Sequence, residues 1–128
     1  MSWLYNTLAL AVTGLIGFLY LYGIDNSLFW RYDWYDAPLH ILGGVVIGLW
    51  GSAVLSRISL RPLYTTLAIL LFALVVGGGW EVFERLAGLT STSQPGYWID
   101  TLQDVFCDIG GALAVMSLYW ALHKPRHE

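Results

Sequence analysis

Long apolar stretches alternate with short segments of charged, polar and turn-forming residues along this chain. The apolar stretches cover residues 3–22, 36–55, 63–84 and 100–122. Each has about the 20 residues that a helix needs to cross a bilayer, and a backbone surrounded by lipid satisfies its own hydrogen bonds as a helix. The pattern therefore predicts an all-α polytopic membrane protein, in which four transmembrane helices form a small bundle and a single domain over residues 1–128.

The composition agrees with a membrane location. Hydrophobic residues make up 57% of the chain and charged residues 12%, whereas about 25% of the residues in a soluble domain are charged. No basic stripe that would bind nucleic acid is present, and the formal net charge is −3. The first apolar stretch lacks a basic leader and a cleavage site, so we expect it to be retained. The expected surroundings are the lipid bilayer, with no nucleic-acid partner.

The basic residues indicate how the chain is oriented. The link over residues 56–62 holds two arginines, and the tail over residues 123–128 holds one lysine and one arginine. Four crossings put this link and the tail on one side, and they put Arg31 and Arg85, both expected in loops, on the other. Because basic residues concentrate on the cytoplasmic side of membrane proteins, we expect both termini in the cytoplasm.

Seven ionisable side chains gather where the last three apolar stretches reach the outward side of the membrane. Spacings of three and four residues put the members of each set on one face of a helix. Ionised side chains at membrane depth avoid lipid, so we expect the three faces to turn inward and converge. The sets are Asp36 with His40, Glu81 with Glu84, and Asp100 with Asp104 and Asp108.

Carboxylates that converge in this way repel one another, so they need a cation, bound protons or arginine partners. The two nearby arginines cannot neutralise so many acids, which leaves a divalent cation or shared protons. A set rich in oxygen with one histidine favours Mg, Mn or Ca, and it leaves Zn or Fe open. In this interpretation all seven side chains are candidate metal ligands, and His40 or Glu81 is the candidate general base.

Two of the seven side chains have a simpler explanation at helix starts. Asp36 precedes Ala37 and Pro38, which fits an N-cap with proline in the first turn. Asp100 is followed three residues later by Gln103, which resembles a capping box. For Asp36 and Asp100, capping is the favoured sole role.

The other five differ in how strongly they indicate a site. Glu84 fits a solvated helix end, and His40 taken alone fits a hydrogen-bonded histidine of the core. Glu81, Asp104 and Asp108 each have apolar neighbours within a span, where a carboxylate is costly. A functional role is therefore favoured for these three over structural hydrogen bonding between helices.

Glycines predict close contacts between the helices. They occur at positions 43, 44, 48 and 51 in the second stretch, at 77–79 in the third, and at 110 and 111 in the fourth. Gly44 and Gly48 have the four-residue spacing with which small residues let membrane helices approach each other.

The order of these residues matches a known pattern: Asp36-x3-His40 with Gly43-Gly44, then Trp80-Glu81-x2-Glu84, then Asp100-Thr101-x2-Asp104-x3-Asp108-x-Gly110-Gly111-Ala112. This pattern resembles the YjdF-like family of small bacterial inner-membrane proteins. It is more distantly similar to the VanZ-like family, which is named for a role in teicoplanin resistance. The resemblance covers residues 36–112 and implies a location in the inner membrane, with little established chemistry.

Three functions are compatible with the sequence. The first is a metal-dependent membrane enzyme that acts on a lipid or lipid-linked phosphate at the outer leaflet. The second is a transport module that uses the acids to conduct protons or a cation. The third is a structural accessory subunit whose acids form a buried polar core. A bundle of four spans leaves little room for a cavity, so a homo-oligomer or a membrane partner is expected in any of them.

Overall fold

A computed structural model describes residues 2–58 and 61–123, and this part of the chain contains helices and no strand. The all-α prediction is confirmed. The elements in chain order are α1 (Ser2–Asp25), α2 (Leu28–Arg31), α3 (Asp36–Leu55), α4 (Pro62–Leu86) and α5 (Tyr97–Leu122).

The four long helices are each long and apolar enough to cross a membrane. They contain 24, 20, 25 and 26 residues. At a rise of about 1.5 Å per residue, even the shortest of them matches a hydrocarbon core of about 30 Å. The protein is therefore a polytopic membrane protein with four transmembrane helices in a small bundle.

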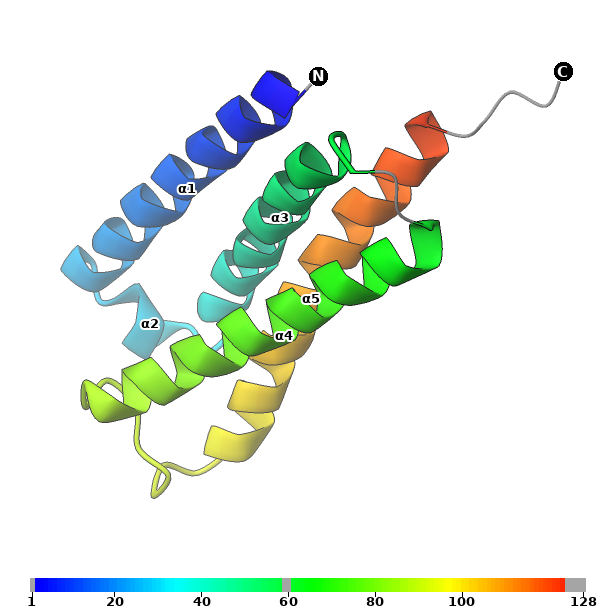
Figure 1. The fold of residues 1–128 in the computed structure, drawn as a ribbon. Coiled ribbons are helices and arrows are strands. Elements are labelled where there is room, and N and C mark those ends of the chain that lie inside the picture. The colour runs from blue at the N-terminus through cyan, green and yellow to red at the C-terminus, as the bar shows by residue number, and fades with distance from the viewer. Residues whose placement is uncertain (1, 59–60, 124–128) are drawn as a thin grey trace, which may run out of the picture.

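The helices are arranged around α3, which packs against α1, α4 and α5 (Figure 1). In its most apolar window 50% of the α3 residues are buried, compared with 11% in α1, so α3 is the central helix. α1 begins and α5 ends at the same end of the bundle (Figure 1). At the opposite end α3 begins, α4 ends and α5 begins, and we call this the site end.

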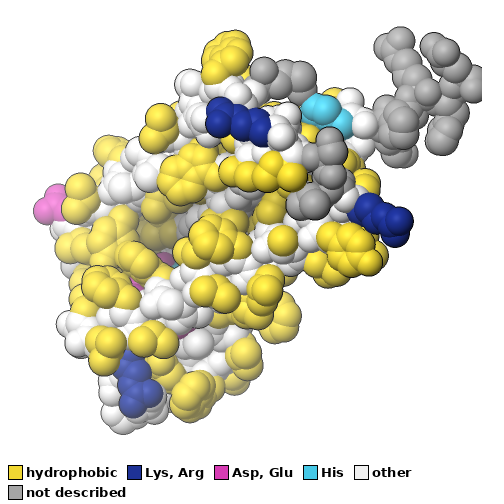
Figure 2. All heavy atoms as spheres, in the orientation of Figure 1, with side chains coloured by type: hydrophobic (Ala, Val, Ile, Leu, Met, Phe, Trp, Pro, Cys, Tyr) yellow, Lys and Arg dark blue, Asp and Glu magenta, His cyan; other side chains and the backbone are white. Residues whose placement is uncertain are grey.

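Apolar side chains cover most of the face drawn in Figure 2, and acidic ones show only at one edge and deep in a hollow. Inside the bundle, two apolar clusters hold the helices together. One joins α3, α4 and α5 through Ile47, Ile69, Ala73, Ala112, Met116 and Tyr119. The other joins α1 and α3 through Ala9, Val46 and Leu49. The charged and polar set of the site end is separate from both clusters.

Glycines let α3 and α5 approach closely at the level of the acidic residues. A methyl group on Gly44 would overlap the backbone oxygen of Asp108, and one on Gly111 would overlap the backbone oxygen of Ile41. The two helices therefore touch backbone to backbone at this point. The contact fixes the register in which Asp108 of α5 lies opposite His40 of α3.

An aromatic anchor holds the start of α3 at the site end. The Tyr35 hydroxyl donates a hydrogen bond of 2.8 Å to the backbone oxygen of Leu19 in α1. The Phe29 ring of α2 packs edge-on against the Tyr35 ring, with the ring centroids 5.0 Å apart. Together these contacts fix the residue that precedes Asp36, and so they hold the first residue of α3 in place.

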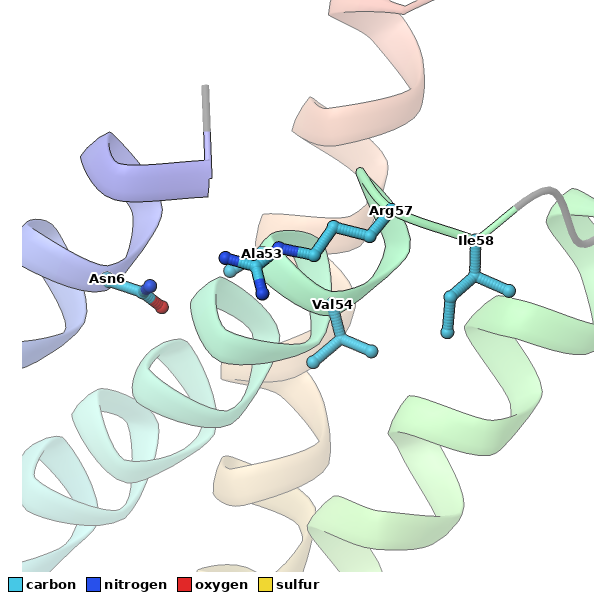
Figure 3. Close-up of a pocket in the computed structure, with 5 residues that line it drawn as sticks. All are labelled: Asn6, Ala53, Val54, Arg57 and Ile58. Carbon is cyan, nitrogen blue, oxygen red and sulfur yellow. The ribbon is translucent and has the colours of Figure 1, made fainter.

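At the opposite end, α1 and α3 enclose a hollow of about 300 Å³ lined by Asn6, Ala53, Val54, Arg57 and Ile58. Figure 3 shows the Arg57 side chain extending over the last turn of α3 toward Asn6 of α1. Its guanidinium also donates a hydrogen bond of 3.4 Å to the Ser2 hydroxyl. Arg57 therefore links the end of α3 to the start of α1.

Candidate metal centre

The imidazole of His40 lies among three carboxylates at the site end, and the side chain is 5% exposed. Its Nδ1 atom is 3.0 Å from Oδ2 of Asp108, which is a hydrogen-bond distance. Its Nε2 atom is 3.8 Å from Oδ2 of Asp36 and 3.7 Å from Oε1 of Glu81. The two sides of the ring therefore face different carboxylates.

Three helices supply the side chains around His40, and the helical repeat sets which of them share a face. Asp36 and His40 are four residues apart on α3, and Asp104 and Asp108 are four residues apart on α5, so each pair lies on one helix face. Glu81 comes from α4, near its end. The predicted convergence of the three helix faces is thus present in the structure.

Glycines on α3 and α4 make the space for the Asp108 carboxylate. A methyl group on Gly43 would lie 3.1 Å from Oδ1 of Asp108, and one on Gly77 would overlap Oδ2. No atom of the bundle lies within 4 Å of a methyl group placed on Gly78, Gly79 or Gly110. Gly43 and Gly77 therefore make room for the Asp108 carboxylate, while Gly78, Gly79 and Gly110 do not contribute to it.

Three of the side chains form a set that could hold a metal ion. Asp36, His40 and Asp104 each offer one ligand atom, and these atoms all lie within 4.8 Å of one another. Bonds from divalent metals to oxygen and nitrogen are about 2.0–2.6 Å long, so two ligands of one ion lie within about 5 Å. The three atoms are close enough to share a single cation.

Two buried carboxylate oxygens have no hydrogen-bond partner among the described residues. They are Oδ1 of Asp104 and Oε1 of Glu81, in residues that are only 2% and 6% exposed. An unpaired buried polar group costs about 1–3 kcal/mol, and an ionised one costs more. A cation or a proton would supply the partner that these two oxygens lack.

The other oxygen of Glu81 has a partner that the sequence analysis missed. The Thr101 hydroxyl of α5 donates a hydrogen bond of 2.9 Å to Oε2 of Glu81. Thr101 lies three residues before Asp104 and therefore on the same side of α5, which is the signal that could have identified it. The bond fixes the Glu81 side chain and leaves its Oε1 atom facing His40.

Glu84 and Asp100 lie outside this set, although both were predicted as ligands. Glu84 is buried at 7% exposure, but among the described residues the carboxylates within 4 Å of the His40 ring nitrogens are those of Asp36, Glu81 and Asp108. Asp100 is exposed in the first turn of α5. The structure thus brings five of the seven predicted side chains together.

Neither of the predicted N-caps is present. The N-cap of α3 is Tyr35, and Asp36 is already the first helical residue. The N-cap of α5 is Gly96, so Asp100 is in the first turn of a helix that starts earlier than expected. Capping therefore does not explain Asp36, whose carboxylate reaches His40 instead.

The two arginines expected in loops lie in helices. Arg31 is in the last turn of α2, and Arg85 is in the last turn of α4. For Arg85 the reason is that α4 continues to Leu86, two residues before Gly88, whose φ of 74° is in the left-handed region that commonly follows a helix end. The backbone N–H of Leu89 donates to the Glu84 oxygen across this turn. Arg85 is therefore held on the same helix face as Glu81, four residues earlier.

Arg85 lines a groove of about 450 Å³ between the end of α4 and the start of α5. Glu81 forms part of the same wall, so the groove adjoins the metal-ligand set. The residues that line it are Gly78, Glu81, Val82, Arg85, Leu86, Tyr97, Trp98 and Thr101.

Comparisons with known proteins place the chain in a family. Over residues 2–125 it matches the family described as "Predicted membrane protein (DUF2238)". No curated protein and no solved structure matches it significantly. The more distant VanZ-like resemblance therefore receives no support. Since the match spans nearly the whole sequence, the chain belongs to the DUF2238 family of predicted membrane proteins, which is the YjdF-like family that the order of its acidic residues resembles.

Proposed function

We propose that this membrane protein binds a divalent cation at the site end, with Asp36, His40 and Asp104 as its ligands. The observation that carries the proposal is the group of three ligand atoms within 4.8 Å of one another. The unpaired, buried Oδ1 atom of Asp104 supports it independently. A cation would supply the partner that this oxygen lacks.

In this proposal Asp108 orients the histidine rather than binding the metal. Its carboxylate accepts a hydrogen bond from Nδ1 of His40 over 3.0 Å, which leaves the lone pair on Nε2 facing Asp36 and Glu81. Metal-binding histidines in proteins commonly donate their second ring N–H to a carboxylate in this way. The predicted ligands Glu84 and Asp100 have no place in this arrangement.

The donor chemistry favours a hard cation. Two carboxylates and one imidazole, with Glu81 beside them, suit Mg, Mn or Ca, while Zn or Fe would also accept this set. Asp36 is 28% exposed at its side chain, so water can reach the site past it. The remaining coordination positions would be filled by water or substrate.

Such a site suits chemistry on a lipid or lipid-linked phosphate at the outer leaflet of the inner membrane, with both termini in the cytoplasm. A bound divalent cation polarises phosphoryl oxygens. Glu81 is the proposed general base, because its Oε2 atom is held by Thr101 while Oε1 is unpaired. The exposed faces of α1 are where we would expect a second copy or another membrane protein to pack.

Transport of protons or cations is less well supported. No carboxylate, histidine, lysine or arginine follows His40 within α3 or Asp108 within α5. The apolar cluster around Ile47 and Met116 occupies that part of the bundle. A path through one chain would therefore lack ionisable groups beyond the site end.

A purely structural polar core is also less well supported. Acids that serve only to join helices would use their oxygens in hydrogen bonds. The bond between His40 and Asp108 fits that role, but Oδ1 of Asp104 and Oε1 of Glu81 do not.

A titration with Mn²⁺ tests the proposal. Detergent-purified, metal-stripped protein is titrated while free Mn²⁺ is measured by electron paramagnetic resonance. We expect saturable binding that Asp104→Asn abolishes and that the matched control Asp100→Asn, which changes an exposed carboxylate, leaves intact. Equal binding by both variants would contradict the proposed ligands, and absence of binding by folded wild type would contradict the cation site.

A further inference from the structure

The groove between α4 and α5 opens sideways toward lipid. Val82, Leu86 and Trp98 are 58%, 82% and 64% exposed, and all three line it. Exposed apolar side chains of a transmembrane bundle face the bilayer. The groove lies at the end of one span and the start of the next, so it is at the depth of the lipid headgroups, where tryptophan is enriched.

Arg85 provides the single positive charge of this lining. Within the described part of the chain its guanidinium forms no ion pair, although Glu81 is one helical turn away. Glu81 is instead hydrogen-bonded to Thr101 and turned toward His40. The guanidinium therefore remains available to an anion, and a planar guanidinium binds phosphate through paired hydrogen bonds.

Glu81 is the single acidic residue of the lining, and its charge would oppose an anion. The proposed cation offsets that charge, because Oε1 of Glu81 is 3.7 Å from the Nε2 atom of His40. Binding of an anion in the groove therefore rests on the proposed function. With the cation in place, the groove combines an apolar channel, a free guanidinium and access to a metal centre.

We propose that the α4–α5 groove binds a phospholipid of the outer leaflet, with its phosphate at Arg85 and an acyl chain along Val82 and Leu86. The groove then delivers the phosphate past Glu81 to the proposed metal ligands. Thr101 is already engaged by Glu81, and Arg85 is the residue of the lining that offers a positive charge to the headgroup phosphate.

Two glycines give a matched pair of variants that tests this proposal. A methyl group on Gly78 or on Gly79 meets no atom within 4 Å, so both positions accept a side chain, but only Gly78 lines the groove. Gly78→Leu should fill the groove, while Gly79→Leu should leave it open. Both variants make the same change in helix propensity.

The experiment measures binding of dioctanoyl phosphatidic acid to Mn²⁺-loaded protein in detergent by calorimetry, with dioctanoylglycerol as the probe that lacks phosphate. We expect wild type and Gly79→Leu to bind phosphatidic acid equally and to prefer it to dioctanoylglycerol. Gly78→Leu and Arg85→Gln should each weaken binding by about tenfold or more, as expected for the loss of charge-assisted hydrogen bonds or of the groove itself.

Three results would overturn the inference. The first is equal affinity of wild type for the two probes, and the second is unchanged binding of phosphatidic acid by Gly78→Leu. The third is that neither wild type nor Gly78→Leu binds lipid, while the substitution dissociates an oligomer of the wild-type protein. Binding of Mn²⁺ is measured on the same wild-type sample. Wild type that holds Mn²⁺ but no lipid contradicts the groove alone, whereas wild type that holds no Mn²⁺ contradicts the proposed function.

Discussion

The two ring nitrogens of His40 have different partners. Nδ1 is hydrogen-bonded to Asp108, while Nε2 is 3.7–3.8 Å from the carboxylates of Glu81 and Asp36. A neutral histidine donates from one nitrogen and accepts at the other. The bond to Asp108 therefore determines which nitrogen would be free to bind a metal, and in our proposal Asp108 acts on the metal through His40.

This arrangement predicts a graded effect for Asp108→Asn. The amide keeps the size of the side chain but supplies a weaker acceptor, so His40 is held less firmly and is a poorer ligand. We expect the affinity for Mn²⁺ to fall by about 10- to 100-fold while the stoichiometry at saturation is unchanged. The titration described above measures both quantities. Unchanged affinity would show that Asp108 does not orient the ligand, and lost stoichiometry would make it a ligand itself.

Some residue roles were predictable and others were not. The helical spacing of Asp36 with His40, and of Asp104 with Asp108, predicted correctly that these pairs share helix faces. The spacing could not show that Asp100, which is four residues before Asp104, is exposed. In the first turn of α5 only Tyr97 is buried, and Trp98, Ile99 and Asp100 are exposed, whereas Asp104 one turn later is buried.

At the scale of the helices, the contact between α3 and α5 decides where the acids meet. The sequence showed many glycines in apolar stretches, but it did not show which of them face a neighbour. Gly44 and Gly111 do so, while Gly78, Gly79 and Gly110 do not. This distinction depends on the rotation of each helix about its axis, which the periodicity of such uniformly apolar helices leaves undetermined.

The end of α4 shows a signal that was present in the sequence but not used. Gly88 adopts a φ of 74°, and the N–H groups of Gly88 and Leu89 donate to the oxygens of Arg85 and Glu84. A glycine after a helical stretch is the usual signal for such an end. Counting back from Gly88 would have placed Arg85 within the helix rather than in a loop.

The helix contact predicts that Gly44→Ala destabilises the protein. The added methyl group would overlap the Asp108 backbone and push α3 and α5 apart, at a cost of about 1–3 kcal/mol. Gly78→Ala is the control, since its methyl group meets no atom within 4 Å. Unfolding in mixed detergent and dodecyl sulfate, followed by circular dichroism, compares the two. Equal stability would contradict the close backbone contact.

In the whole molecule, the buried ionisable side chains and the apolar core occupy different levels along the bundle. Six buried or half-buried ionisable side chains lie at the site end, and an apolar cluster of α3, α4 and α5 lies apart from them. Each buried charge would destabilise the bundle if it had no partner. Among the described residues no arginine pairs with these carboxylates, and a cation shared by Asp36, His40 and Asp104 would neutralise them.

The metal content of the purified protein is the decisive measurement for the proposed cation site, made by elemental mass spectrometry on wild type, Asp104→Asn and Asp100→Asn. We expect a stoichiometric divalent metal in wild type and in Asp100→Asn, and its loss in Asp104→Asn. Folded wild type that holds no metal, even after incubation with Mg²⁺, Mn²⁺, Ca²⁺ and Zn²⁺, would contradict the account and leave shared protons to neutralise the buried carboxylates.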